Sequence, residues 1–265
     1  MTPRLDSAQL GDGPPVILLH GLSATKRYVV HRSKALPRSG HRIVAYDARG
    51  HGESAAPEDP DAYEYSDLCA DLGRIMDEYE VERAALAGVS MGAHTALRFA
   101  LERPERVAAV VAITPGYDGQ AAETGRWDAM ADALDEGGVE GFLASWGARD
   151  VSERFRDAAL ENARQRLSLH RDLGAVARAL RVVPRSQAFD GLEALREIEA
   201  PALVVGSRDE ADPMHPLALA ERYAEELPNG RVLVEEEGKA PLAWQGARLS
   251  RAIAEFLGSL PGAAA

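Results

Sequence analysis

Ser90 stands at the centre of a G-x-S-x-G pentapeptide over residues 88–92, and a serine in this setting can act as a nucleophile. An apolar run over 84–87 precedes the pentapeptide, and apolar residues recur at helical spacing over 93–101. A strand, a tight turn and a helix in this order hold the serine in a strained turn with its hydroxyl pointing outward. The pattern therefore predicts a nucleophile elbow, in which glycines at 88 and 92 avoid clashes with neighbouring backbone.

Attack on a carbonyl creates an oxyanion, and we expect two backbone amides to bind it. The Met91 amide lies at the N-terminus of the predicted helix, where backbone donors are free. Residues 20–22, His-Gly-Leu, end the first clear apolar strand, and their position makes the Leu22 amide the second donor. Gly21 allows this backbone to approach the substrate closely. Leu22 and Met91 are therefore the predicted oxyanion hole.

The segment D-A-R-G-H-G-E-S over 47–54 follows the second clear strand and concentrates charge around a histidine. It lacks the G-x-x-x-x-G-K pattern of a phosphate-binding loop. We expect a structural turn held by Asp47 and Arg49, with His51 outside the catalytic set.

The apolar runs indicate the scaffold that must position these residues. Unbroken aliphatic runs suit parallel strands that are buried on both faces. Strands are predicted over 16–20, 42–46, 84–89, 107–113, 202–206 and 231–235, and helices between them over 67–79, 91–102, 216–227 and 244–257. This alternation predicts an α/β fold with a mostly parallel sheet.

A long stretch from about 114 to 183 contains helical patterns and no convincing strand. The patterns cover 121–134, 139–146, 151–169 and 173–183. One crossover connection does not need so many residues, so we expect a helical cap, or lid, over residues 115–183. Such a cap would cover the crevice in which open parallel sheets bind ligands. The core is then formed by residues 1–114 and 184–265.

The 265-residue chain carries 42 acidic and 30 basic side chains, a formal net charge of −12. This balance argues against nucleic acids as partners, since they bind basic faces, and against anionic membrane surfaces. No apolar run approaches the ~18 residues of a membrane span, and the N-terminus lacks the apolar stretch of a signal peptide. We therefore expect a cytoplasmic protein that acts on a small molecule. Its single cysteine, Cys69, allows no internal disulfide, and no pattern predicts a metal or another cofactor.

Together these segments resemble the α/β-hydrolase family, in its esterase- and lipase-like branch with a serine nucleophile. The resemblance rests on His-Gly at 20–21, D-x-R-G-H-G-x-S at 47–54, G-x-S-x-G at 88–92 and G-x-x-D at 206–209, and it spans nearly the whole chain. It implies a central sheet of about eight strands, a cap at the helical insertion, and a triad of nucleophile, acid and histidine. Ser90 takes the nucleophile position.

The acid of such a triad is expected in the loop after the strand that ends at Gly206. Counting forward from Gly206 selects Asp209, and counting back from the helix at Pro216 selects Asp212. The loop is longer than is usual in the family. We favour Asp209 because the strand end is the firmer anchor for a triad acid, while Asp212 would begin a turn before the helix.

The histidine that usually follows the last strand is missing, because Lys239 occupies its position and no histidine occurs after His215. Three interpretations are open. In the first, Lys239 is the base, and burial lowers its pKa so that it loses its proton. The acidic residues 235–237, which we expect to be a solvated strand end, would oppose this loss. In the second, His215 on the acid loop is the base. It is better placed than His94, which lies on the helix after the elbow, although both histidines suit turn-stabilising roles. In the third interpretation Lys239 pairs with Asp209, and the nucleophile is poorly activated.

These observations predict a serine hydrolase that cleaves a small ester, thioester or lactone through an acyl-Ser90 intermediate, with Asp209 and Lys239 as acid and base. The alternative is a non-catalytic or ligand-binding protein of the same fold, or a cofactor-free enzyme whose reaction is not hydrolysis. The replacement of the expected histidine by Lys239 is what keeps this alternative open.

Overall fold

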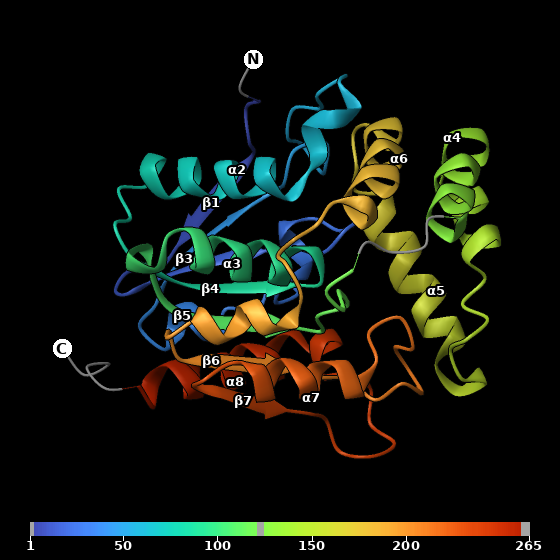
Figure 1. The fold of residues 1–265 in the computed structure, drawn as a ribbon. Coiled ribbons are helices and arrows are strands. Elements are labelled where there is room, and N and C mark those ends of the chain that lie inside the picture. Colours follow the sequence, from blue (N-terminus) through green and yellow to red (C-terminus); the bar gives the residue numbers. More distant parts are fainter. Residues whose placement is uncertain (1–2, 121–124, 261–265) are drawn as a thin grey trace.

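A seven-stranded, mostly parallel sheet forms the centre of the molecule in the computed structural model, which describes residues 3–120 and 125–260 (Figure 1). Its strands are β1 (Ser7–Leu10), β2 (Pro15–Leu19), β3 (Arg42–Tyr46), β4 (Ala84–Val89), β5 (Val107–Ile113), β6 (Ala202–Val205) and β7 (Gly230–Leu233). Their order across the sheet is β1-β3-β2-β4-β5-β6-β7, and β1 is antiparallel to β3. Because the other strands are parallel, the loops that follow them meet at one edge of the sheet.

The predicted α/β fold is confirmed, and three strands (42–46, 84–89 and 107–113) have the predicted bounds. The sheet has seven strands within the described ranges, where the family resemblance implied about eight. β1 was not predicted, because this edge strand, SAQL, is largely exposed and carries no apolar run that sequence analysis could detect.

Helices cover both faces of the sheet because side chains along each strand alternate between the faces. Ile17 and Leu19 pack into one core, and their neighbours Val16 and Leu18 pack into another. The first core is covered by α2 (Tyr65–Glu78), α3 (Met91–Glu102) and α7 (Leu217–Glu226), and the second by α1 (Ala35–Arg38) and α8 (Gly246–Gly258). Burial on both faces explains why the strand sequences are continuously apolar.

Between β5 and β6 the described residues form three α-helices, namely α4 (Gly125–Trp146), α5 (Glu153–Leu167) and α6 (Leu173–Val182). Their apolar side chains form a core of their own, which includes Met130, Phe142 and Leu180. Figure 1 shows them beside the end of the sheet to which the β4 arrow points. Gly138, with a φ of 59°, interrupts α4 between the two helices that the sequence predicted there. Residues 121–124 of the predicted helix over 121–134 lie outside the described residues.

Of the helices in the two described ranges, none combines the length and apolarity needed to cross a lipid bilayer.

Candidate active site

The turn between β4 and α3 holds Ser90 in a strained backbone conformation. Ser90 has a φ of 49° and a ψ of −112°, a region that non-glycine residues rarely occupy. A Cβ added at Gly88 would lie 2.2 Å from the carbonyl carbon of Gly92, and one at Gly92 would lie 2.4 Å from the Leu19 carbonyl oxygen. Both positions therefore require glycine, and Ser90 lines a cavity.

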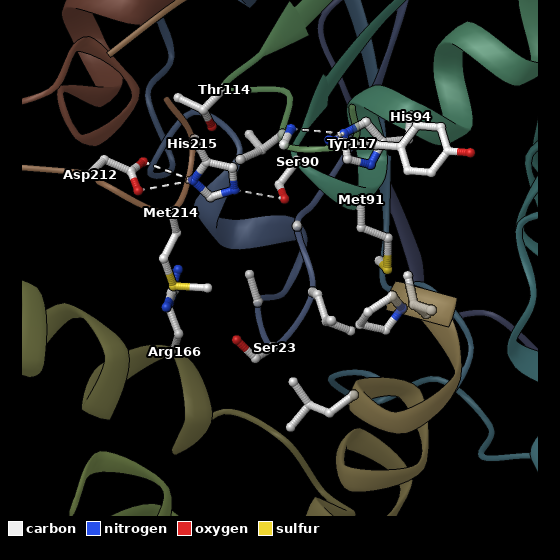
Figure 2. A pocket seen from close by; sticks show the side chains of 18 of the residues that line it. Ser23, Ser90, Met91, His94, Thr114, Tyr117, Arg166, Asp212, Met214 and His215 are labelled. Atoms are coloured by element: carbon white, nitrogen blue, oxygen red, sulfur yellow. Dashed lines mark hydrogen bonds and ion pairs between the residues drawn. The ribbon is translucent and has the colours of Figure 1, made fainter. Parts of the chain in front are cut away.

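Ser90, His215 and Asp212 form a continuous hydrogen-bonded chain (Figure 2). The Nε2 atom of His215 lies 2.9 Å from Ser90 Oγ. Its Nδ1 atom lies 2.9 and 3.0 Å from the two carboxylate oxygens of Asp212. With the ring proton on Nδ1 donated to the carboxylate, Nε2 is free to accept a proton from the serine hydroxyl.

One turn supplies both the histidine and its carboxylate partner. The His215 amide donates to the Asp212 carbonyl at 3.1 Å, so residues 212–215 form a β-turn. Pro213 occupies the second position, where its fixed φ favours such turns. The long loop after β6 thus brings an acid and a histidine, three residues apart, to the same serine.

Asp209 and Lys239, the acid and base favoured from the sequence, lie outside this hydrogen-bonded chain. Asp209 is exposed, and its Oδ1 accepts a hydrogen bond of 2.8 Å from the Leu217 amide at the start of α7. Lys239 is exposed and does not line the cavity at Ser90. The structure therefore brings together Ser90, His215 and Asp212, and it gives Asp209 a helix-capping contact.

The carboxylate of Glu235 is buried, although residues 235–237 were expected to be a solvated strand end; Glu236 and Glu237 are exposed. Glu235 accepts hydrogen bonds from the Arg208 amide at 2.7 Å, the Ser207 hydroxyl at 3.3 Å and the Leu242 amide at 3.2 Å. These bonds tie the segment after β7 to the loop that carries Asp212 and His215. Glu235 therefore acts as a structural anchor for that loop.

Leu22 and Met91, whose amides are the predicted oxyanion hole, both line the cavity with Ser90. Met91 is the first residue of α3, where amides have no acceptor within the helix. In the described part of the chain, the Leu22 amide has no backbone acceptor. Gly21 packs against the elbow, because a Cβ there would lie 3.3 Å from the Val89 carbonyl oxygen. Their role as an oxyanion hole is a prediction that this arrangement supports.

His94 has a structural role on the turn after β5, as the sequence suggested. Its Nε2 accepts hydrogen bonds from the amides of Gly116 and Tyr117 at 3.0 and 3.2 Å, and its Nδ1 lies 2.9 Å from the Tyr65 hydroxyl. Burial, together with the neighbouring His215, lowers the pKa of His94 to about 3. The imidazole is therefore neutral and holds the turn that packs beside His215.

The loop that contains Leu22 is held by two further histidines. His51 Nε2 accepts from the Ser23 amide at 3.4 Å, and His170 Nε2 donates to the Ser23 carbonyl at 3.2 Å. The His170 Nδ1 accepts from the Gly52 amide at 2.9 Å. Because His170 lies between α5 and α6, it connects the helical insertion to the predicted oxyanion loop.

The turn over 47–54 is structural, as predicted. Asp47 accepts hydrogen bonds from the Lys26 amide and side chain, both at 2.8 Å. Arg49 makes two hydrogen bonds of 2.7 Å to the buried carboxylate of Asp71. His51 is buried and held by the backbone, and burial lowers its pKa well below the usual value.

Acidification is expected to destabilise the folded protein in part through His170. Burial lowers the pKa of His170 to about 4, aided by His20 and Arg166 and opposed by the Ser23 carbonyl and Asp47. An unfolded histidine has a pKa of about 6.5, so the unfolded chain binds more protons between these two values and stability falls as the pH falls. Between about pH 7 and pH 4.5, the Tm of the wild type should fall further than that of His170→Asn. Equal falls in both proteins would contradict this role of His170.

A cavity of about 430 Å³ opens onto Ser90 between the sheet edge and the helical insertion. Its lining is largely apolar, and the contributing side chains include Leu22, Trp127, Met130, Phe142 and Trp146. Within residues 3–120 and 125–260, no three His, Cys, Asp or Glu side chains are grouped to hold a metal ion. The cavity therefore offers an apolar binding space beside Ser90, whose hydroxyl is hydrogen-bonded to His215.

The chain matches known proteins over most of its length. Residues 14–191 match the family described as alpha/beta hydrolase fold. A candidate carbamate hydrolase, RutD, of Variovorax paradoxus (strain S110) is 29% identical over 263 residues, with 95% of both chains covered. A candidate 2-succinyl-6-hydroxy-2,4-cyclohexadiene-1-carboxylate synthase of Bacillus subtilis (strain 168) is 28% identical over 263 residues, covering 92% of this chain and 90% of that protein.

Solved structures show the same architecture. The enol-lactonase from Burkholderia xenovorans LB400 superimposes with a TM-score of 0.81 over 96% of both chains, at 21% sequence identity. At that identity the likeness shows the fold alone. The family match, which covers more than half of the chain, shows that this protein belongs to the α/β-hydrolase fold family.

Proposed function

We propose that this protein is a serine hydrolase that cleaves a small carboxylic ester, thioester or lactone through an acyl-Ser90 intermediate. The observation that carries the proposal is the hydrogen-bonded chain from Ser90 Oγ through His215 to Asp212. In this proposal His215 and Asp212 are the base and the acid, in place of Lys239 and Asp209.

The first half of the proposed reaction transfers the acyl group to the serine. Ser90 Oγ attacks the carbonyl carbon while His215 Nε2 takes the hydroxyl proton. The negative charge that develops on the carbonyl oxygen is bound by the amides of Leu22 and Met91, and in other enzymes loss of one such donor lowers kcat by about 10²- to 10³-fold. Asp212 holds the ring proton on Nδ1 and stabilises the imidazolium. His215 then protonates the leaving alcohol or thiol as its bond to the acyl carbon breaks.

The second half releases the acid product. His215 Nε2 takes a proton from water as the water oxygen attacks the acyl carbon, and the proton then returns to Ser90 Oγ as the ester bond breaks. The helical insertion over 115–183 acts as a cap that encloses the substrate and limits access of bulk water. The small size and the apolar lining of the cavity support a small substrate with an apolar part.

The comparisons support hydrolase activity at a coarse level. One relative that matches along most of the chain is named as a candidate carbamate hydrolase. Another relative of similar coverage is named as a synthase, so a cofactor-free reaction without hydrolysis is the second candidate. The two candidates differ in whether Ser90 becomes acylated during the reaction.

Treatment with an activated fluorophosphonate is expected to add one equivalent of label to the protein, at Ser90. The reason is that His215 activates the hydroxyl for attack on the electrophilic phosphorus. Mass spectrometry of the intact protein and of its peptides checks the stoichiometry and the position. Ser90→Ala should take up no label, and absence of an adduct in the wild type between about pH 6 and pH 10 would contradict the serine-nucleophile mechanism.

A further inference from the structure

We infer that Arg166 binds a carboxylate of the substrate, so that the preferred substrates carry a free carboxylate at a distance from the scissile bond. The inference deepens the proposed function and rests on it. Arg166 lies on α5 and lines the cavity that contains Ser90 and His215. Figure 2 shows its guanidinium on the α5 side of the cavity, directed toward Met214.

The charged side chains around Arg166 already have partners. Asp212 accepts from His215, and Arg126 and Asp150 pair with each other at 3.3 Å beside an adjoining cavity of about 100 Å³. Arg166 lines both cavities and forms no ion pair with any residue that the structure describes. Asp212 attracts the Arg166 cation without forming an ion pair with it, so a ligand anion in the cavity can be its direct partner.

The hydrogen-bonding groups of this wall are also without partners. Arg166 Nε is buried and has no hydrogen-bond partner among the described residues, and the same holds for Asn162 Oδ1. The two side chains are four residues apart on α5, so they share one face of the helix, and both line the cavity. Buried polar groups are nearly always hydrogen-bonded in folded proteins. Both atoms are covered by protein, so a ligand anion would be bound by the terminal nitrogens of Arg166 and the amide nitrogen of Asn162, which are donors.

A carboxylate is an anion whose geometry suits an arginine. The guanidinium presents parallel N–H donors that match the two oxygens of a carboxylate. Much of the cavity lining is apolar, and it suits a hydrocarbon segment between the carboxylate and the reacting carbonyl. Burial lowers the pKa of Arg166, with Asp212 and Tyr28 opposing, but an arginine keeps its charge in such surroundings.

Matched pairs of esters test the inference. We compare the mono-4-nitrophenyl esters of succinate, glutarate and adipate with the uncharged 4-nitrophenyl esters of equal chain length. At least one anionic ester should exceed its uncharged counterpart in kcat/KM by about 10-fold or more. In Arg166→Met that ratio should fall by about 10- to 100-fold, and Arg166→Lys should retain part of it because it keeps the charge.

The control variant is Arg164→Met, on the same helix. Arg164 is exposed, pairs with Glu140 at 2.7 Å and does not line the cavity. Its ratio of kcat/KM values should remain that of the wild type. If Arg166→Met lowers kcat/KM equally for the anionic and the uncharged esters, Arg166 acts on Asp212 and not on substrate, and the inference is overturned.

Direct binding separates this inference from the proposed function. Ser90→Ala protein, which leaves the ester intact, is titrated with mono-4-nitrophenyl glutarate by calorimetry. The Kd should rise by about 10-fold or more when Arg166→Met is introduced into the Ser90→Ala protein as a second substitution. An unchanged Kd, or no saturable binding of any of the three anionic esters, overturns the inference. Failure of the proposed function has a different signature, namely no label at Ser90 and no turnover of either kind of ester.

Discussion

Replacing His215 with alanine is expected to lower kcat for 4-nitrophenyl butyrate by about 10⁴-fold or more. His215 is the side chain whose nitrogen lies 2.9 Å from Ser90 Oγ, so its loss removes the acceptor for the serine proton. Without that acceptor, attack must proceed from a neutral hydroxyl with water as the base. The rate of fluorophosphonate labelling should fall with kcat, since both reactions need the same activated oxygen. The Ser90→Ala variant sets the background against which this loss is measured.

Lys239→Ala is the matched control for His215→Ala, because Lys239 occupies the position where the family usually has its histidine. Its side chain is exposed and outside the cavity lining. Such a surface change should leave kcat and KM within about twofold of the wild type. If instead Lys239→Ala lost as much activity as His215→Ala, or His215→Ala remained active, the lysine would be the base. The Tm of each variant shows whether a loss of activity reflects unfolding.

The fold and the elbow could be predicted from the sequence because they depend on local patterns. Aliphatic runs bounded by turns mark strands buried on both faces, and the positions of β3, β4 and β5 follow from them. The pentapeptide around Ser90 encodes a strained turn through its glycines, whose Cβ atoms would clash with backbone. β1 gave no such signal, since an exposed edge strand needs no apolar run.

The proposed acid and base were harder to predict because they depend on how one long loop folds. Counting from the strand end selected Asp209, whereas the structure turns Asp209 toward the Leu217 amide and brings Asp212 beside His215. The signal was present in D-P-M-H over 212–215, where a proline follows an aspartate that can begin a turn. A family pattern that expects the histidine after the last strand directs attention to Lys239 instead.

The position of Arg166 in the cavity could not be predicted, because nothing in the sequence of α5 distinguishes Arg166 from its neighbours. Arg164 and Arg166 are both arginines in the last turn of the helix. Only the packing of α5 against α4 and the loop after β6 turns Arg166 toward the cavity and leaves Arg164 exposed to pair with Glu140. The burial of Glu235 likewise depends on packing that the local sequence does not reveal. Of the three consecutive glutamates, two are exposed, and Glu235 is buried among donors from distant segments.

Asp212→Asn is expected to lower kcat by about 10²- to 10⁴-fold with little change in KM. The carboxylate of Asp212 accepts the Nδ1 proton of His215 and so keeps Nε2 unprotonated toward Ser90. An asparagine offers an NH₂ group as well as an oxygen, and it carries no charge to stabilise the imidazolium of the transition state. The effect should therefore appear in kcat, because the contact becomes stronger only as the reaction proceeds.

Asp209→Asn is the matched control for Asp212→Asn, since it makes the same chemical change three residues earlier in the same loop. Asp209 accepts from the Leu217 amide at the start of α7, and the side-chain oxygen of an asparagine can accept the same hydrogen bond. Its kcat should stay within about twofold of the wild type, and its Tm should change little. If the two variants exchanged these outcomes, the acid would be Asp209, and the hydrogen bond between Asp212 and His215 would serve only to hold the turn. The pair therefore tests the two aspartates that counting along the sequence could not separate.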